Sequence, residues 1–177
     1  MSKFKINKTI KPFYRTLNIE GDKSLSIRWA LLASQAIGKS YAKNLLKSDD
    51  VLHTLNCLKK LGTKIEKKKD KYEIHGLGLN GYKFKNNIIL DAGNSGTLGR
   101  LILGLLIHTK KKIKLIGDKS LSKRDFLRVT KPLENFGANL KTSSGKLPIT
   151  VTGTKNPVPV RYYENKGSAQ CKSAIML

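Results

Sequence analysis

Cysteine and long apolar runs are both scarce in this sequence. Only two cysteines occur, Cys57 and Cys171, there is no CxxC pair, and the three histidines do not have the spacing of zinc ligands. The sequence therefore predicts neither a disulfide framework nor a metal site, and we expect both thiols to be buried. No stretch approaches the roughly 18 apolar residues of a membrane span, and the N-terminus lacks the apolar centre of a signal peptide. These absences favour a cytoplasmic protein with no membrane partner.

Acidic residues and arginine are also few. Twelve acids stand against 35 basic residues, which gives a formal net charge of +23, and only six of the basic residues are arginines. The lysine runs at 67–69 and 110–112 lie in or beside expected turns, where solvated charge is the ordinary explanation. A basic nucleic-acid-binding module is the alternative that this charge raises. No RNA-stacking motif accompanies it, so nucleic acid is an unfavoured partner.

The stretch from Leu90 to Arg100 organises the rest of the chain. An apolar run ends there at a glycine-rich turn, L-D-A-G-N-S-G-T-L-G-R, and a helical pattern begins. Gly93 and Gly96 permit positive φ, and Asn94, Ser95 and Thr97 are helix-capping residue types. Free N–H groups at a helix start attract phosphate or carboxylate, and Arg100 follows one turn later. The alternative is an ordinary turn whose glycines serve packing alone.

The hydrophobic pattern predicts a mixed α/β chain built from β-α-β-α-β-β units. Residues 1–20 alternate weakly and indicate an extended strand that leads to Gly21. A helix with Ser24 as its cap should follow. The remaining elements are expected as a helix at 48–61, strands at 63–65, 71–74 and 87–90, a helix at 97–108, a strand at 112–116, a helix at 120–136, and strands at 138–141 and 148–152.

The chain also repeats itself. The expected helix starts at Ser24, Gly96 and Ser168 are each 72 residues apart, and the pairs Leu58/Gly62 and Leu133/Gly137 are 75 apart. Two full units and the start of a third are therefore predicted. The last residues lie in the first turns of a helix without a stop signal, which indicates a truncated polypeptide.

Four motifs together resemble the 5-enolpyruvylshikimate-3-phosphate (EPSP) synthase family: GDKSLSIR (21–28), LDAGNSGTLGR (90–100), GDKSLSKR (117–124) and GSAQCKSA (167–174). The resemblance runs from Gly21 to the end of the chain. It implies a two-domain enzyme in which each domain is an inside-out α/β barrel-like assembly of three units. Residues 21–177 would then be the incomplete first domain, and residues 1–20 a strand and hinge that belong with the absent second domain.

The activity implied by the resemblance is that of a 3-phosphoshikimate 1-carboxyvinyltransferase. Such an enzyme moves the enolpyruvyl group of phosphoenolpyruvate to the 5-hydroxyl of shikimate 3-phosphate and releases phosphate, a step toward chorismate and aromatic amino acids. No cofactor or metal is implied, the full-length enzyme would be monomeric, and glyphosate is an inhibitor of the family. A sister transferase acting on a UDP-sugar lacks the GDKS-x-S-x-R motif. An isolated binding or structural domain is the third alternative.

The resemblance also assigns site residues. Lys23 would be the catalytic residue and would contact both substrates. The shikimate 3-phosphate ligands would be Lys23, Ser24, Arg28, Ser168, Ala169 and Gln170. The phosphoenolpyruvate ligands would be Lys23, Asn94, Gly96, Thr97, Arg100 and Arg124. The carboxylates for general acid and base work would come chiefly from the second domain, so this chain alone should be inactive. Helix capping is the favoured explanation of Asp49 and Asp50.

Two departures from the family pattern stand out, together with one structural consequence. Asp125 and Glu20 stand where proline is common, and Asp125 places a negative charge beside Arg124. Gly96, at a position where some tolerant enzymes carry alanine, leaves glyphosate sensitivity open. We further expect the missing third unit to leave apolar surface uncovered on the helices that begin at Ser24 and Thr97.

Overall fold

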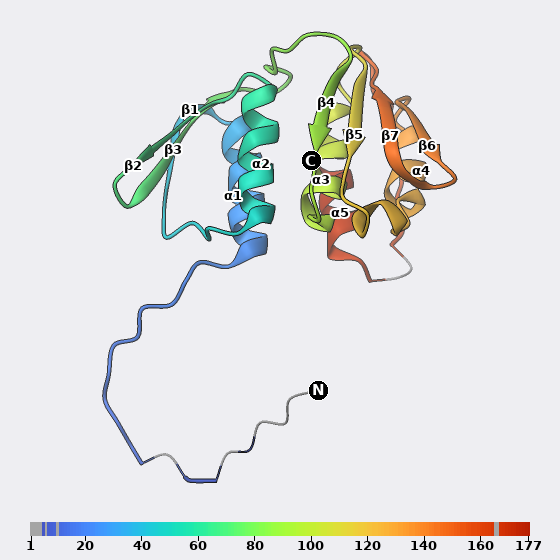
Figure 1. Ribbon diagram of the computed structural model, residues 1–177. Helices are drawn as coiled ribbons and strands as arrows, with labels where there is room; N and C mark the ends of the chain where they lie inside the picture. Colours follow the sequence, from blue (N-terminus) through green and yellow to red (C-terminus); the bar gives the residue numbers. More distant parts are fainter. Residues whose placement is uncertain (1–4, 6, 10, 165–166) are drawn as a thin grey trace.

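Two α/β units lie side by side in this computed structural model, which describes residues 5, 7–9, 11–164 and 167–177 (Figure 1). The first contains α1 (Lys23–Gln35), β1 (Ile37–Lys43), α2 (Asp49–Lys60), β2 (Lys64–Lys68) and β3 (Lys71–Leu77). The second contains β4 (Ile88–Asp91), α3 (Gly96–Leu106), β5 (Ile113–Ile116), the 3-10 turn η1 (Leu121–Lys123), α4 (Leu127–Glu134), β6 (Asn139–Ser143) and β7 (Lys146–Thr152). Helix α5 (Ala169–Met176) follows. The mixed α/β class is as predicted.

The two sheets differ by one strand. The first has the order β1-β3-β2 with antiparallel pairing, and the second has the order β4-β5-β7-β6, in which only β4 and β5 are parallel. Strands β1, β3 and β2 match β5, β7 and β6, so within the described residues the first sheet has no counterpart of β4. Residues 11–20 form no strand and are exposed, which makes the predicted strand wrong over this range. Residues 1–4, 6 and 10 of that prediction lie outside the described part.

Three local predictions are corrected. Asp22, not Ser24, caps α1, since its Oδ1 accepts a hydrogen bond from the N–H of Leu25 at 2.7 Å. Strand β1 was missed because the sequence IGKSYAK has little apolar alternation, and its backbone pairing with β3 makes it a strand.

The helix expected at 120–136 is instead η1 followed by α4. Arg124 is extended between them, and the N–H of Phe126 donates to the carbonyl of Gly145 at 2.9 Å. A tertiary hydrogen bond to the β6–β7 hairpin therefore interrupts a sequence that is helical on both sides.

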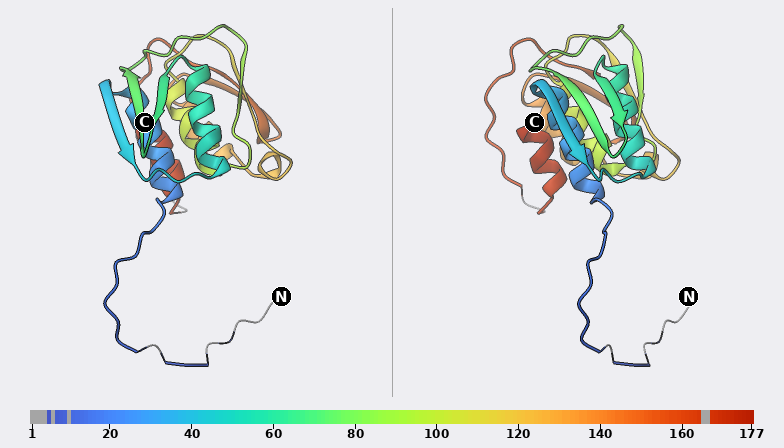
Figure 2. Two further views of the ribbon diagram at one scale, coloured as in Figure 1. Left: turned by 60° about the vertical axis from the view of Figure 1, so that its left-hand side comes forward. Right: turned by 90° about the vertical axis from the view of Figure 1, so that its left-hand side faces the viewer.

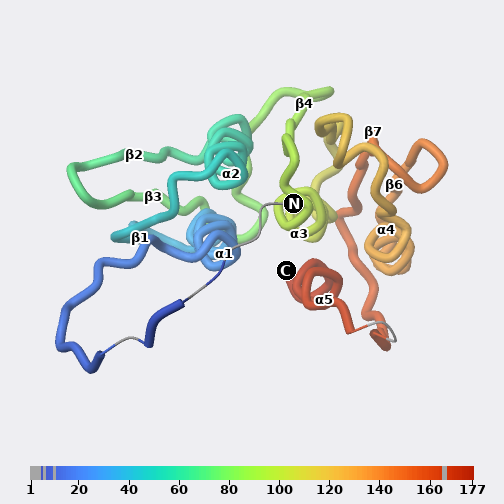
Figure 3. The backbone as a smooth tube through the Cα atoms, turned by 60° about the horizontal axis from the view of Figure 1, so that its bottom comes forward, coloured from blue at the N-terminus to red at the C-terminus, as the bar shows by residue number. Residues whose placement is uncertain are grey.

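Helix α3 lies at the centre of the core, as the end-on view of Figure 3 shows. Every residue of α3 is buried. Helix α1 buries one side only, because Leu25 and Leu32 are 67% and 57% exposed. The expectation of uncovered apolar surface therefore holds for α1 and is wrong for α3. Helix α5 runs beside α1 (Figure 2) and packs on α3, where Gly104 lies close to Ala174.

Both cysteines are buried and unpaired, as predicted. Cys57 on α2 donates its thiol proton to the carbonyl oxygen of Asp91 at 3.3 Å, which ties α2 to the end of β4. None of the helices in the described part of the chain is long and apolar enough to cross a membrane.

Candidate functional site

A pocket of about 300 Å³ lies where four helices begin. Its lining comes from the first turns of α1, α2, α3 and α5, from the turn before α3, and from the segment after η1. The lining residues are Lys23, Asp50, Asn94, Gly96, Thr97, Arg124 and Gln170. Because each helix start carries partial positive charge and free N–H groups, this arrangement favours an anion.

The turn between β4 and α3 is held from several sides. Gly93 has φ +54°, its N–H donates to the Asp91 carboxylate at 2.8 Å, and its carbonyl accepts from the N–H of Asp118 at 2.8 Å. A Cβ on Gly93 would lie 2.5 Å from Nε2 of His53. Ser95 then caps α3 by accepting from the N–H of Leu98 at 3.2 Å. Packing explains Gly93, while the same rigid turn presents Asn94 and Gly96 to the pocket.

Two arginines donate hydrogen bonds to this turn and to the first residue of α3. Arg124, which is exposed, donates to Oδ1 of Asn94 at 2.8 Å. Arg100 is only 7% exposed and lies behind the pocket lining, where it donates to Oε1 of Gln170 at 2.8 Å. Gln170 in turn donates to Oγ1 of Thr97 at 3.1 Å. These bonds connect α3, α5 and the segment after η1 around one pocket.

Burial makes Arg100 receptive to a negative charge. Desolvation lowers the pKa of its guanidinium from the ordinary value, and the positive charge of Arg128 acts in the same direction. Its buried Nε has no hydrogen-bond partner among the described residues, whereas its terminal nitrogens also reach the carbonyls of Gly96 and Asp125 at 3.3 Å. A desolvated cation with an unused donor gains free energy when an anion approaches.

Gly96 lies between the two guanidinium groups. A Cβ at this position would lie 2.8 Å from a terminal nitrogen of Arg100 and 3.0 Å from one of Arg124. Any larger side chain would therefore displace at least one arginine. Glycine keeps the floor of the pocket open between its cations.

The structure revises the explanation of the acids at the start of α2. Asp50 forms an ion pair with Lys23, with 3.0 Å between Oδ2 and Nζ, and both side chains line the pocket. Capping alone therefore does not explain Asp50, although it stands in the first turn of α2 with Asp49. No sequence signal linked Asp50 to Lys23, because their contact depends on how α1 and α2 pack.

Five of the residues expected at the site lie outside this pocket lining: Arg100, described above, and Ser24, Arg28, Ser168 and Ala169. Arg28 reaches Oγ of Ser173 at 3.5 Å and borders a separate hollow of about 270 Å³ between α1 and α5. Ser24 lies next to Lys23 on α1. Ser168 caps α5 by accepting from the N–H of Cys171 at 3.3 Å, and Ala169 is the exposed first residue of that helix. The structure thus groups the expected phosphoenolpyruvate residues more closely than the shikimate 3-phosphate residues.

Asp125 does not oppose Arg124 directly. Its Oδ1 accepts a hydrogen bond from the N–H of Leu127 at 2.9 Å, at the start of α4, while its carbonyl oxygen accepts from Arg100. The carboxylate of Asp125 therefore lies next to the start of α4, where the helix dipole stabilises its negative charge.

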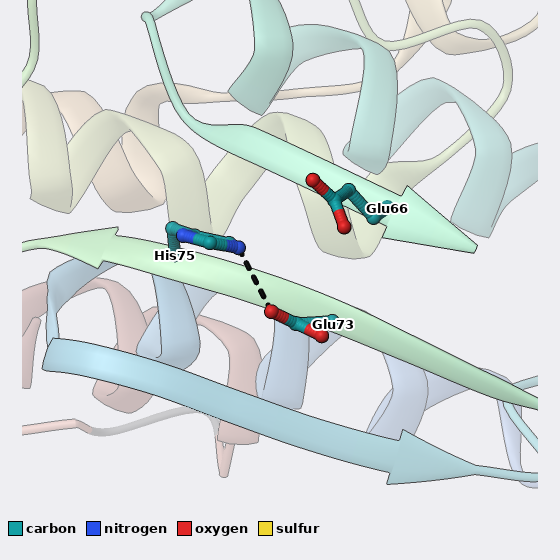
Figure 4. Close-up of side chains that lie close together, drawn as sticks. All are labelled: Glu66, Glu73 and His75. Carbon is teal, nitrogen blue, oxygen red and sulfur yellow. Dashed lines mark ion pairs between the residues drawn. The ribbon is translucent and has the colours of Figure 1, made fainter. Parts of the chain in front are cut away.

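A second cluster of possible ligand atoms lies on the first sheet, away from the pocket: Glu66, Glu73 and His75 (Figure 4). Lys68 Nζ lies 2.7 Å from Glu73 Oε2, and Lys39 Nζ lies 3.2 Å from Glu73 Oε1. The hydrogen bond from Lys68 is the main reason that the pKa of Glu73 is lowered to about 2. Because ammonium groups already neutralise these carboxylates, the cluster is better described as an ion-pair network than as a metal site.

Cys57 is unsuited to covalent chemistry. Burial raises the pKa of its thiol to about 12, so the nucleophilic thiolate is scarce at neutral pH. The chemistry that the described residues support is therefore the binding of anions by cationic side chains, backbone amides and helix starts.

Comparisons with known proteins agree with this geometry. The family model described as EPSP synthase (3-phosphoshikimate 1-carboxyvinyltransferase) matches residues 7–177. A 3-phosphoshikimate 1-carboxyvinyltransferase from Vesicomyosocius okutanii is 44% identical over the whole chain, and one from Streptococcus suis is 40% identical over 97% of it. The chain spans 40% and 41% of the lengths of these relatives.

A solved structure gives the same result. The EPSP synthase of Acinetobacter baumannii superposes with a TM-score of 0.85 at 36% identity, over 90% of this chain and 36% of that one. At this identity the similarity extends beyond the fold. The chain belongs to the EPSP synthase family and corresponds to the N-terminal part of its longer members.

Proposed function

We propose that this chain forms the first-domain half of a site that transfers the enolpyruvyl group of phosphoenolpyruvate to the 5-hydroxyl of shikimate 3-phosphate, with release of inorganic phosphate. The observation that carries the proposal is the pocket at the four helix starts, which is lined by the cations Lys23 and Arg124 together with Gly96 and Asn94. Both substrates are anions, and such a pocket offers them cations and N–H groups without requiring a cofactor.

The residues divide the work between the two substrates. Lys23, Asn94, Gly96, Thr97, Arg100 and Arg124 hold the phosphate and carboxylate of phosphoenolpyruvate. Shikimate 3-phosphate meets Lys23, Ser24, Arg28, Ser168, Ala169 and Gln170. Gln170 connects the two sets of residues, because it hydrogen-bonds with Arg100 and Thr97, which are assigned to phosphoenolpyruvate. Lys23, the catalytic residue of the proposal, belongs to both groups.

The same proposal covers the domain organisation, oligomeric state and localisation of the full-length protein. Residues 21–177 are the first domain, with two complete units and the start of a third in an inside-out barrel-like assembly, and residues 1–20 belong with a second domain. The second domain supplies the remaining acid and base groups, so the 177-residue chain binds substrate without turning it over. The full-length protein is a cytoplasmic monomer. Family membership supports these statements, since the chain spans about 40% of its relatives.

A calorimetric titration of this chain with shikimate 3-phosphate, and with shikimate as control, tests the acceptor half at low and moderate salt. We expect saturable binding that requires the 3-phosphate. Equal affinity for shikimate, or no binding by a chain whose circular dichroism shows that it is folded, would overturn the acceptor assignment. RNA binding that weakens steeply with salt and ignores shikimate 3-phosphate would favour a nucleic-acid-binding module.

Gly96→Ala tests the donor half. The added methyl group would press on Arg100 and Arg124, so we expect the dissociation constant of phosphoenolpyruvate to rise about tenfold and that of shikimate 3-phosphate by less than about twofold. Gly99→Ala is the matched control in the same helix, since its Cβ would meet Phe126 only at 3.4 Å. Equal effects of Gly96→Ala on both ligands would contradict the placement of phosphoenolpyruvate beside Gly96.

A further inference from the structure

Among the described residues that line the pocket, Asp50 is the only one with a carboxylate. Its side chain is 18% exposed, whereas that of its partner Lys23 is 51% exposed. A carboxylate in an anion-binding pocket lowers the positive potential that a ligand would feel. Its presence there therefore needs an explanation of its own.

The field around Lys23 provides one. Lys23 is the first residue of α1, where the helix dipole disfavours a cation, and the starts of α2 and α3 and the guanidinium of Arg124 add further positive charge. An unrestrained lysine with a four-carbon stem would point its ammonium group into solvent. Asp50 opposes this tendency, because its carboxylate is itself favoured in the first turn of α2 and lies 3.0 Å from the ammonium.

We propose that Asp50 is a positioning residue that holds the ammonium group of Lys23 at the rim of the pocket before the substrate arrives. The inference rests on the proposed function, because it concerns how Lys23 meets the bound anions. The inference predicts the direction in which removal of Asp50 changes the affinity for an anion. If Asp50 acted only as a nearby negative charge, its removal would tighten the binding of an anion; if it positions Lys23, its removal weakens binding.

The experiment compares Asp50→Asn, Lys23→Met and the double variant with the parent chain by calorimetric titration with shikimate 3-phosphate. We expect the dissociation constant to rise about threefold to tenfold in Asp50→Asn. In the Lys23→Met background, Asp50→Asn should change it by less than about 1.5-fold, because no ammonium group remains to be positioned. Asp50→Glu, which keeps the charge on a longer stem, should recover part of the affinity.

Asp49→Asn is the matched control. Asp49 precedes Asp50 in the same first turn of α2, but it is exposed and lies outside the pocket lining. Its replacement removes the same charge from the same helix start, so it reports the effects on helix stability and net charge. We expect a change in dissociation constant of less than about 1.5-fold. A similar loss of affinity in Asp49→Asn and Asp50→Asn would overturn the positioning role, as would tighter binding by Asp50→Asn.

Thermal unfolding of the same four proteins judges the pairing without any ligand. If Asp50 and Lys23 are coupled, Asp50→Asn lowers the melting temperature in the parent but not in Lys23→Met. Additive shifts would overturn the pairing even if substrate binds. If the parent does not bind shikimate 3-phosphate but the melting shifts are non-additive, the proposed function is overturned, while the coupling between Asp50 and Lys23 is retained.

Discussion

Helices α1 and α3 occupy equivalent places in the two units, yet their surroundings differ. A shift of 72 residues relates Arg28 to Arg100 and Leu32 to Gly104. Arg100 is buried and donates to Gln170 at 2.8 Å, whereas Arg28 is only partly buried, with its contacts at 3.5 Å. Gly104 lies under α5, and Leu32 projects into solvent. The helices begin at similar places in the repeated sequence, and the neighbouring helices decide what each side chain contacts.

Helix α5 is the source of the difference. It begins at Ala169, 73 residues after the start of α3, and packs on α3 while it leaves part of α1 open. A glycine at position 104 permits this approach, and a leucine at position 32 does not reproduce it. The two helices therefore provide matched positions at which the contribution of α5 can be measured.

Gly104→Ala should have the largest effect on stability among the substitutions in α3. The new Cβ would lie 1.9 Å from the carbonyl oxygen of Ala174, a backbone atom that cannot move without shifting α5. We expect the free energy of unfolding to fall by about 2–3 kcal/mol. Chemical denaturation measures this. Gly99→Ala is the control, since its contact at 3.4 Å is ordinary and alanine favours the helix; a comparable loss there would show that α5 is not the cause.

Arg100→Lys and Arg28→Lys should separate the two equivalent arginines. Lysine cannot replace the bonds of Arg100 to Gln170 and to two carbonyls, so we expect a loss of about 1–2 kcal/mol in unfolding free energy. Arg28→Lys should change stability by less than about 0.5 kcal/mol. It should nevertheless weaken shikimate 3-phosphate, because the planar guanidinium is lost. Denaturation and titration of both variants check this, and an unchanged affinity in Arg28→Lys would contradict bidentate recognition.

The sequence predicted the strand, turn and helix around Gly93 and Gly96 because each step depends on local chemistry. Apolar residues end, Gly93 adopts positive φ, and Ser95 caps the helix. Gly96 does not have the positive φ that was expected, because it is the first residue of α3. The same local logic located the starts of α3 and α5. Strand β1 escaped prediction because its stability comes from pairing with β3, which lies about 30 residues later. The prediction of one helix over residues 120–136 was wrong for a similar reason, since the hydrogen bond from Phe126 to Gly145 is a tertiary contact.

The candidate site shows the same limit. Motifs identified Lys23, Arg124 and Gln170 as site candidates, but the roles they were assigned remain predictions. Asp50 was attributed to helix capping, because a sequence gives no sign that the first turns of α1 and α2 meet. Arg100 was expected to line the pocket with Arg124, and its burial behind Gln170 depends on the docking of α5. Local chemistry thus indicates which residues matter, and packing determines which of them touch.

Glu73→Gln should reveal a contribution to stability from the first unit that is lost only in acid. Because the pKa of Glu73 is lowered to about 2, its ionised carboxylate stabilises the folded state fully above about pH 4.5, and this stabilisation is lost as pH falls toward 2. Melting temperatures of Glu73→Gln should therefore depend less on pH between 4.5 and 2 than those of the parent. Glu134→Gln, an exposed carboxylate on α4, is the control. If the melting temperatures of the parent and Glu73→Gln changed in parallel with pH, the ion pairs of Glu73 would not contribute to stability.

Leu32→Ser should have the smallest effect, and it completes the comparison with Gly104. Leu32 is 57% exposed beside α5, so little apolar area returns to water when it is replaced. We expect the free energy of unfolding to change by less than about 0.5 kcal/mol, measured by chemical denaturation. Ile27→Ala, on the buried side of α1, should cost about 2–4 kcal/mol and serves as the control. A large loss in Leu32→Ser would mean that the contact of α1 with α5 stabilises the chain as the contact of α3 does, and the two helices would then differ in sequence but not in role.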